Sequence, residues 1–176
     1  MSQLFASEVT LSMKFKISLF AMLCSSALLA QQHAHQHGIA NATLVIDQQQ
    51  IEWQMDIPAD QVVGFEHAPN TPQEQAQQAA QLQNLQPHSW LVWPSAANCQ
   101  LKNASFAPEP GDSAHVDYVS SASWQCADVS QIKQLQLDLF ALTTGLEQVQ
   151  LQYVTPQGQG AATLTMDQNQ LSFADN

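Results

Sequence analysis

Residues 51–57 read IEWQMDI, and this stretch decides the fold. Every second residue in it is hydrophobic, and the residues between them are polar. The hydrophobic residues are Ile51, Trp53, Met55 and Ile57, and the polar ones are Glu52, Gln54 and Asp56. This alternation predicts a β-strand with one buried face. The polar stretch 48–50 joins it to the apolar run 43–47, a spacing typical of a β-hairpin.

The same alternation returns through the second half of the chain. It is found at 97–101, 116–126, 135–139, 149–153, 162–166 and 171–173. Turn-forming residues separate these segments, most clearly in PQGQG at 156–160. Short strands with regular turns predict a mainly β fold with antiparallel, sandwich-like sheets. One amphipathic α-helix accompanies them, so α+β is the alternative label.

The sequence NTPQE at 70–74 marks the start of that helix. Thr71 is a good N-cap, Pro72 suits the first helical position, and Glu74 completes a capping box. A modest apolar face is expected from Ala76, Ala79, Ala80 and Leu82. The helical pattern ends near Pro87.

Residues 1–30 have the features of a secretory signal peptide. Two lysines precede the apolar run 17–30, which ends in small residues. We expect cleavage after Ala30, with Ala27 as the alternative, and translation to begin at Met13. The predicted organisation is a signal peptide at 1–30, a flexible His-rich segment at 31–41 and a single domain at 42–176.

Signal cleavage would leave Cys99 and Cys126 as the two cysteines of the exported chain. An even pair in an exported protein indicates a disulfide, which would stabilise the fold by about 3–4 kcal/mol. A pair of metal-binding thiolates is the alternative, and an oxidising compartment disfavours it.

The charge of the chain argues against two classes of partner. Four lysines and no arginine stand against 15 acidic residues, which gives a net charge of −11. Four basic groups can neutralise few phosphates. We therefore expect no nucleic-acid binding and no docking on anionic lipid. The apolar run 17–30 is shorter than a membrane span, so we expect no membrane insertion after cleavage.

Three histidines near the predicted mature terminus, His33, His35 and His37, indicate metal binding. Imidazole is a good ligand for Zn²⁺, Cu²⁺ and Ni²⁺, and alternate side chains of an extended segment lie on one face. Cleavage after Ala30 would also place His33 third from a free amine, an arrangement that suits square-planar Cu²⁺ or Ni²⁺. The alternative is a solvated terminus that is rich in histidine without binding metal.

Two further pairs combine imidazole with carboxylate. Glu66 and His67 are adjacent where a strand gives way to the helix, and His115 and Asp117 share one face of a predicted strand. Either pair could supply nitrogen and oxygen ligands to zinc, or could be ordinary solvated residues. His88 follows the helix, where we expect it to contact the terminal carbonyl groups.

The sequence offers no catalytic motif. The serines at 120–123 lack a nucleophile elbow, and no phosphate-binding loop is found. We therefore expect a protein that is not an enzyme.

Several blocks together resemble the ZrgA family of periplasmic zinc-uptake proteins. They are HG at 37–38, VVGFEHAPNTPQEQ at 62–75, CQL at 99–101, HVDY at 115–118, WQC at 124–126 and YVTPQGQGAATLT at 153–165. The likeness extends in order over 33–173, and its most specific parts are GFEHAP and TPQGQGAA. Carried over residue by residue, the resemblance places the family's motif residues on His37, Gly38, Phe65, Glu66, His67, Cys99, His115 and Cys126.

The resemblance implies a periplasmic protein of a Gram-negative bacterium that captures Zn²⁺ and supports a zinc ABC-type importer. Many members carry a long run of His, Asp and Glu between the cysteine-bearing strands, whereas residues 106–118 here hold one histidine. The chain is therefore expected to bind few ions, with the N-terminal histidines as collectors and His67, Glu66, His115 and Asp117 as holders. The alternatives are a copper or nickel chaperone and an envelope interaction module without metal.

Overall fold

The computed structural model describes residues 37–109 and 115–173. Its strands are β1 (Ile39–Asp47), β2 (Gln50–Pro58), β3 (Leu91–Val92), β4 (Cys99–Pro108), β5 (Asp117–Cys126), β6 (Gln134–Leu137), β7 (Gln148–Thr155), β8 (Gly158–Leu164) and β9 (Gln170–Ser172). Its α-helices are α1 (Ala59–Val63) and α2 (Pro72–Leu85). Single 3₁₀ turns lie at Ser95–Ala97, Val129–Gln131 and Phe140–Leu142.

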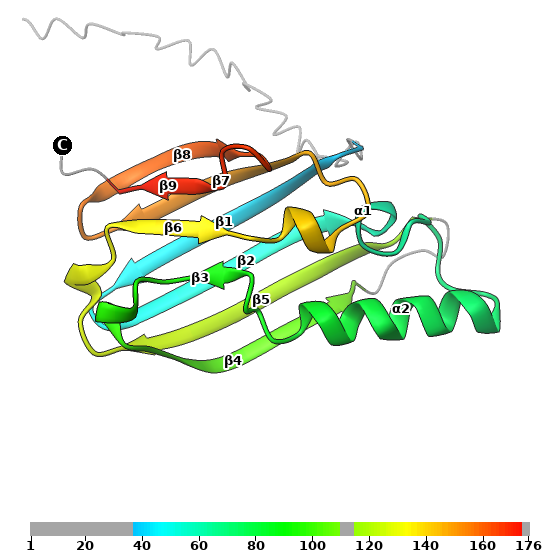
Figure 1. Cartoon of the computed structure of the whole chain (residues 1–176), viewed down its shortest axis with the longest axis horizontal. Coiled ribbons are helices and arrows are strands. Elements are labelled where there is room, and N and C mark those ends of the chain that lie inside the picture. Colours follow the sequence, from blue (N-terminus) through cyan, green and yellow to red (C-terminus); the bar gives the residue numbers. More distant parts are fainter. Residues whose placement is uncertain (1–36, 110–114, 174–176) are drawn as a thin grey trace, which may run out of the picture. The chain divides into compact units, whose positions relative to one another are not determined.

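The strands form a six-stranded sheet in the order β4-β5-β2-β1-β7-β8 and a three-stranded sheet in the order β3-β6-β9 (Figure 1). The predicted mainly β class is confirmed. The large sheet is mixed, because β1 and β7 pair in parallel while its other neighbours are antiparallel. Parallel strands need a crossover connection. Here the chain leaves β5, forms β6 in the small sheet and then returns to the large sheet as β7. The start of β7 pairs with the start of β1.

The core lies on one face of the large sheet. Alternate residues of β1, β2 and β5 are buried, and the residues between them on β1 and β2 are exposed. The buried residues form one hydrophobic cluster with Leu91 of β3 and with Leu135 and Leu137 of β6. Trp53 packs edge-on against Trp90, with ring centroids 6.0 Å apart. The small sheet therefore covers the hydrophobic face that the alternation predicted.

Strand β1 begins at Ile39, earlier than the predicted start at Thr43. Ala40 is fully buried in it, and the carbonyl of Gly38 accepts hydrogen bonds from the backbone N–H groups of Glu147 and Gln148. The last three residues of the segment predicted to be flexible, 39–41, thus belong to the sheet.

The predicted start of helix α2 is confirmed. Thr71 is the N-cap, Pro72 opens the helix, and the side chains and backbones of Thr71 and Glu74 form a reciprocal capping box. The three alanines expected on an apolar face are exposed instead, and Leu85 is the one buried residue of α2.

Glutamine amides attach α2 to the rest of the domain. Gln77 donates to the carbonyl of Val63 at 2.6 Å, and Gln78 donates to the Tyr118 hydroxyl at 2.7 Å. Gln81 donates to the carbonyl of Leu142. Leu82, which was expected on the apolar face, and Leu85 do pack against the core. The amide hydrogen bonds add to this packing, and an analysis of hydrophobic periodicity does not detect them.

Cys99 and Cys126 form a disulfide, as predicted. They lie directly opposite each other at one end of the β4–β5 pair, with Cα atoms 3.9 Å apart. Because both sulfurs are bonded to each other, the alternative of a thiolate metal site does not hold.

His88 is buried in the core with 1% of its surface exposed. Its Nδ1 donates to the carbonyl of Gln86 at 2.7 Å, so its Nε2 accepts from the Ser120 hydroxyl at 2.9 Å. The imidazole stacks on Trp90 with ring centroids 5.2 Å apart. Burial lowers the pKa of His88 below 6.5, which keeps the ring neutral. The expected contact with a carbonyl group at the end of the helix is confirmed.

This neutral imidazole makes stability depend on pH. Below about pH 6.5 the unfolded chain binds a proton at His88 that the folded chain does not bind, so the free energy of unfolding falls as the pH falls. The slope from this group is at most about 1.4 kcal/mol per pH unit. We expect urea unfolding to show this fall, and His88→Gln to flatten it. An unchanged slope in His88→Gln would contradict the assignment.

Candidate metal centre

The candidate metal centre lies at one end of the large sheet, where three neighbouring strands begin or end. Strands β1 and β5 begin there and β2 ends there, because β2 is antiparallel to both. His37 precedes β1, Asp60 follows β2 in α1, and His115 precedes β5. Segments that are far apart in sequence thus place their polar residues side by side.

Backbone hydrogen bonds hold these segments together. Ala59 N–H donates to the carbonyl of Val116 at 3.0 Å, and Val116 N–H donates to the carbonyl of Glu66 at 2.8 Å. Gly64 ends α1 in a left-handed conformation, with φ of 82°, and turns the chain so that Glu66 returns to this end of the sheet. Asp60, Glu66 and His115 are therefore positioned by main-chain contacts.

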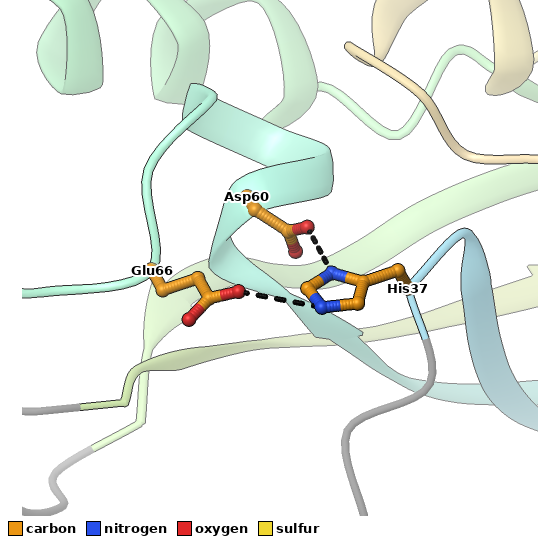
Figure 2. Close-up of side chains that lie close together, drawn as sticks. All are labelled: His37, Asp60 and Glu66. Carbon is orange, nitrogen blue, oxygen red and sulfur yellow. Dashed lines mark hydrogen bonds and ion pairs between the residues drawn. The ribbon is translucent and has the colours of Figure 1, made fainter.

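The side chains of His37, Asp60 and Glu66 converge (Figure 2). His37 Nδ1 lies 2.9 Å from Asp60 Oδ2, and His37 Nε2 lies 3.6 Å from Glu66 Oε1. One potential ligand atom from each residue lies within 4.8 Å of the others. The second oxygen of Glu66, Oε2, lies 3.5 Å from His115 Nδ1. The same small hollow is lined by all four residues together with Pro58, Ala59 and Val116.

The two carboxylates control the charge of His37. The pKa of His37 is raised above 6.5, first by its hydrogen bond to Asp60 and then by the negative charges of Asp60 and Glu66. The His37 side chain is 72% exposed, whereas that of Asp60 is 20% exposed. A cation that arrives from solvent can therefore reach the imidazole, and imidazole with carboxylate is a ligand set that suits Zn²⁺.

The structure separates the predicted ligands. His37 and Glu66 belong to the cluster, and His115 lies against Glu66. Asp117 is the first residue of β5 and lies outside the cluster. His33 and His35 lie outside the described residues.

His67 lies apart from this cluster. Its Nδ1 donates to the carbonyl of Ala68 at 2.9 Å, and its ring stacks on Phe65 with centroids 5.2 Å apart. Its Nε2 lies 3.9 Å from Glu74 Oε1, and Glu74 completes the capping box of α2. His67 therefore belongs to the start of the helix, although it is adjacent in sequence to Glu66.

Asp60 is the member of the cluster that sequence reasoning missed. It has no histidine or acidic neighbour in the sequence PADQVV, so no local pattern marks it. The only signal is its place two residues beyond the end of a strand. The pairing of β2 with β1 is what brings it to His37.

The family model described as ZrgA family zinc uptake protein matches residues 34–173. The chain belongs to the ZrgA family. The match includes every residue of the candidate metal centre and confirms the resemblance carried by the sequence blocks. Among curated proteins, none matches the chain. Within residues 37–109 and 115–173, every helix is too short or too polar to span a bilayer.

Gly38 follows His37 and has a left-handed backbone conformation. Its φ is 79°, and a Cβ on it would stand 3.1 Å from Glu147 Cγ. We expect Gly38→Ala to lower the free energy of unfolding by about 1–2 kcal/mol, because an L-residue is strained in this conformation. It should also displace His37 from Asp60 and bring the His37 pKa closer to 6.5, as measured by NMR titration.

The control is Gly158→Ala, since Gly158 also has positive φ but lies at the β7–β8 turn with open space around it. It should lower stability and leave the His37 pKa unchanged. Equal His37 pKa values in Gly38→Ala and the parent would show that Gly38 does not position this ring.

Proposed function

We propose that this protein captures Zn²⁺ in the periplasm at the His37–Asp60–Glu66 cluster and supports zinc import, acting by binding and not by catalysis. The observation that carries the proposal is the convergence of an imidazole and two carboxylates from three separate segments, within 4.8 Å, in a member of a zinc uptake family. The His37 and Glu66 side chains are exposed at the surface, where an ion can reach them, and the Asp60 side chain is more buried.

The exposure of the cluster suits a protein that must release its ion. Structural zinc sites are closed by four protein ligands, whereas sites that exchange ligands keep a position open. Here His37 is largely exposed, and Glu66 and His115 are also solvent-accessible. An ion held among them remains accessible to a ligand of a second protein, such as the zinc-binding component of an ABC-type importer.

The N-terminal histidines would collect zinc for this cluster. His35 and His33 precede His37 by two and four residues. A fully extended chain spans about 3.6 Å per residue, so this short spacing in sequence suits the transfer of an ion to His37. The net charge of −11 raises the local concentration of cations, an effect that salt weakens.

Two features support export to the periplasm. Residues 1–30 have the pattern of a signal peptide, and the Cys99–Cys126 disulfide is typical of oxidising compartments. We therefore infer that the protein works in the periplasm of a Gram-negative bacterium, as the resemblance to the family implies.

A zinc titration against a chromophoric chelator tests the proposed function. We expect the parent to compete with the chelator and His37→Ala to lose most of this competition. The double variant His33→Ala/His35→Ala should bind fewer zinc ions or bind them more slowly. The affinity of the tightest site should not change. The matched control His67→Ala removes an exposed imidazole outside the cluster and should behave as the parent. Failure of the parent to compete would overturn the proposed function, and equal losses in His37→Ala and His67→Ala would overturn the site.

Zinc affinity should depend on pH. Zinc and the proton compete for the same imidazole nitrogens, and the pKa of His37 lies above 6.5 because of Asp60 and Glu66. We therefore expect the apparent affinity to fall as the pH is lowered from about 7.5 to about 5, with the fall beginning above about pH 6.5. The chelator competition repeated across this range measures it. Equal affinities at the two ends of the range would contradict histidine ligation.

A further inference from the structure

We propose that the ligands of the zinc ion are His37 Nε2, Glu66 and His115, and that Asp60 is a positioning residue that orients the His37 ring. This inference rests on the proposed function and assigns the ligands of the same site. It differs from the simple reading of the three-residue cluster, in which Asp60 would itself bind the ion.

The distances between the side-chain atoms distinguish a zinc ligand from a residue that only positions a ligand. Four ligands placed tetrahedrally at about 2.0–2.1 Å from zinc are about 3.3 Å apart. The separation of His37 Nδ1 and Asp60 Oδ2 is 2.9 Å, which is the length of a hydrogen bond. Glu66 Oε1 lies 3.6 Å from His37 Nε2, and Glu66 Oε2 lies 3.5 Å from His115 Nδ1. Each imidazole nitrogen is thus about one tetrahedral edge from one oxygen of the same carboxylate.

The hydrogen bond to Asp60 also sets the tautomer of His37. A neutral imidazole that donates from Nδ1 carries its lone pair on Nε2. That nitrogen is the one that faces Glu66 (Figure 2). A histidine that binds metal through one nitrogen and donates from the other to a carboxylate is the common arrangement in metal sites.

Asp60 is fixed in a way that suits orientation. Its Oδ2 accepts a second hydrogen bond, from Gln61 Nε2 at 2.7 Å. Thr144 in turn donates from its hydroxyl to the carbonyl of Asp60 at 2.9 Å and from its N–H to the carbonyl of Gln61 at 2.8 Å. The other carboxylate oxygen, Oδ1, is buried, so an ion that enters from solvent meets the exposed imidazoles and Glu66 first.

Glu66 lies between the two imidazoles. One of its oxygens faces His37 and the other faces His115, and all three side chains line the same hollow. His115 is not a member of the group of ligand atoms that all lie within 4.8 Å, so binding requires its ring to turn towards the ion. More than half of its surface is exposed, which leaves room for this rotation.

Two imidazoles and one carboxylate leave the fourth zinc position open. Such a three-ligand set is the one found where zinc must accept water or another ligand. In a protein that passes its ion on, the open position is where a ligand of the receiving protein would attach before the ion leaves.

X-ray absorption spectroscopy of the zinc-loaded protein tests this assignment. The full chain carrying His33→Ala/His35→Ala keeps the N-terminal imidazoles out of the measurement. We expect two imidazole ligands in this background, two after Asp60→Asn, and one after His115→Ala. Zinc affinity should fall roughly 10- to 100-fold in Asp60→Asn, as for loss of an orienting group, and further in Glu66→Gln. His67→Ala is the control and should retain two imidazole ligands and the parent's affinity.

A measurement without metal gives a second readout. ¹⁵N NMR of the His37 ring should show a proton on Nδ1 in the neutral parent, and a mixture of tautomers in Asp60→Ala. Two results would overturn the ligand assignment and leave the proposed function standing. One is an unchanged number of imidazole ligands and an unchanged zinc affinity in His115→Ala. The other is a loss of zinc affinity in Asp60→Asn as large as that in Glu66→Gln. Absence of zinc binding by the parent would instead overturn the proposed function.

Discussion

The register of β2 between β1 and β5 is the constraint on which the rest of this structure depends. Ile51, Trp53, Met55 and Ile57 all point to the core because β2 pairs with β1 on one side and β5 on the other. A shift of one residue would move all four to the exposed face and carry the polar residues between them into the core. Burial of these side chains therefore fixes where each strand begins and ends. The positions of His37, Asp60 and His115, just outside those ends, follow from it.

The structure gives two histidines opposite properties through their surroundings. His88 is enclosed by aromatic rings, and its pKa is lowered because the charged form would lose its hydration. His37 is exposed between two carboxylates, and its pKa is raised because its charged form is hydrogen-bonded and attracted to them. Both nitrogens of His88 are occupied by core partners. His37 is the one that a solvent-borne cation can reach.

The disulfide and the candidate metal centre lie at opposite ends of β5. The disulfide joins β4 to the last residue of β5, and His115 precedes its first residue. At the candidate site, main-chain hydrogen bonds through Val116 hold the backbone, while the His115 and Glu66 side chains stay at the surface.

The sequence by itself determined the elements whose signals are local. The strand alternation and the capping box at Thr71 and Glu74 follow from residue types at short spacing. The disulfide follows from the cysteine count of the exported chain and the family from several sequence blocks, and the structure and the comparison with the family confirm them. His37 and Glu66 were also named from the sequence, His37 as one of three alternating histidines and Glu66 as the carboxylate next to His67.

Only the tertiary structure decided which of these residues meet. The parallel pairing of β1 with β7 depends on a crossover through the small sheet, and no local pattern encodes it. Asp60 joins His37 because β2 ends where β1 begins, and His67 turns away to the start of α2 although it adjoins Glu66. Side-chain periodicity reports which face of an element is buried. Contacts between elements are set by the order in which strands pair, and that order depends on the packing of the whole core.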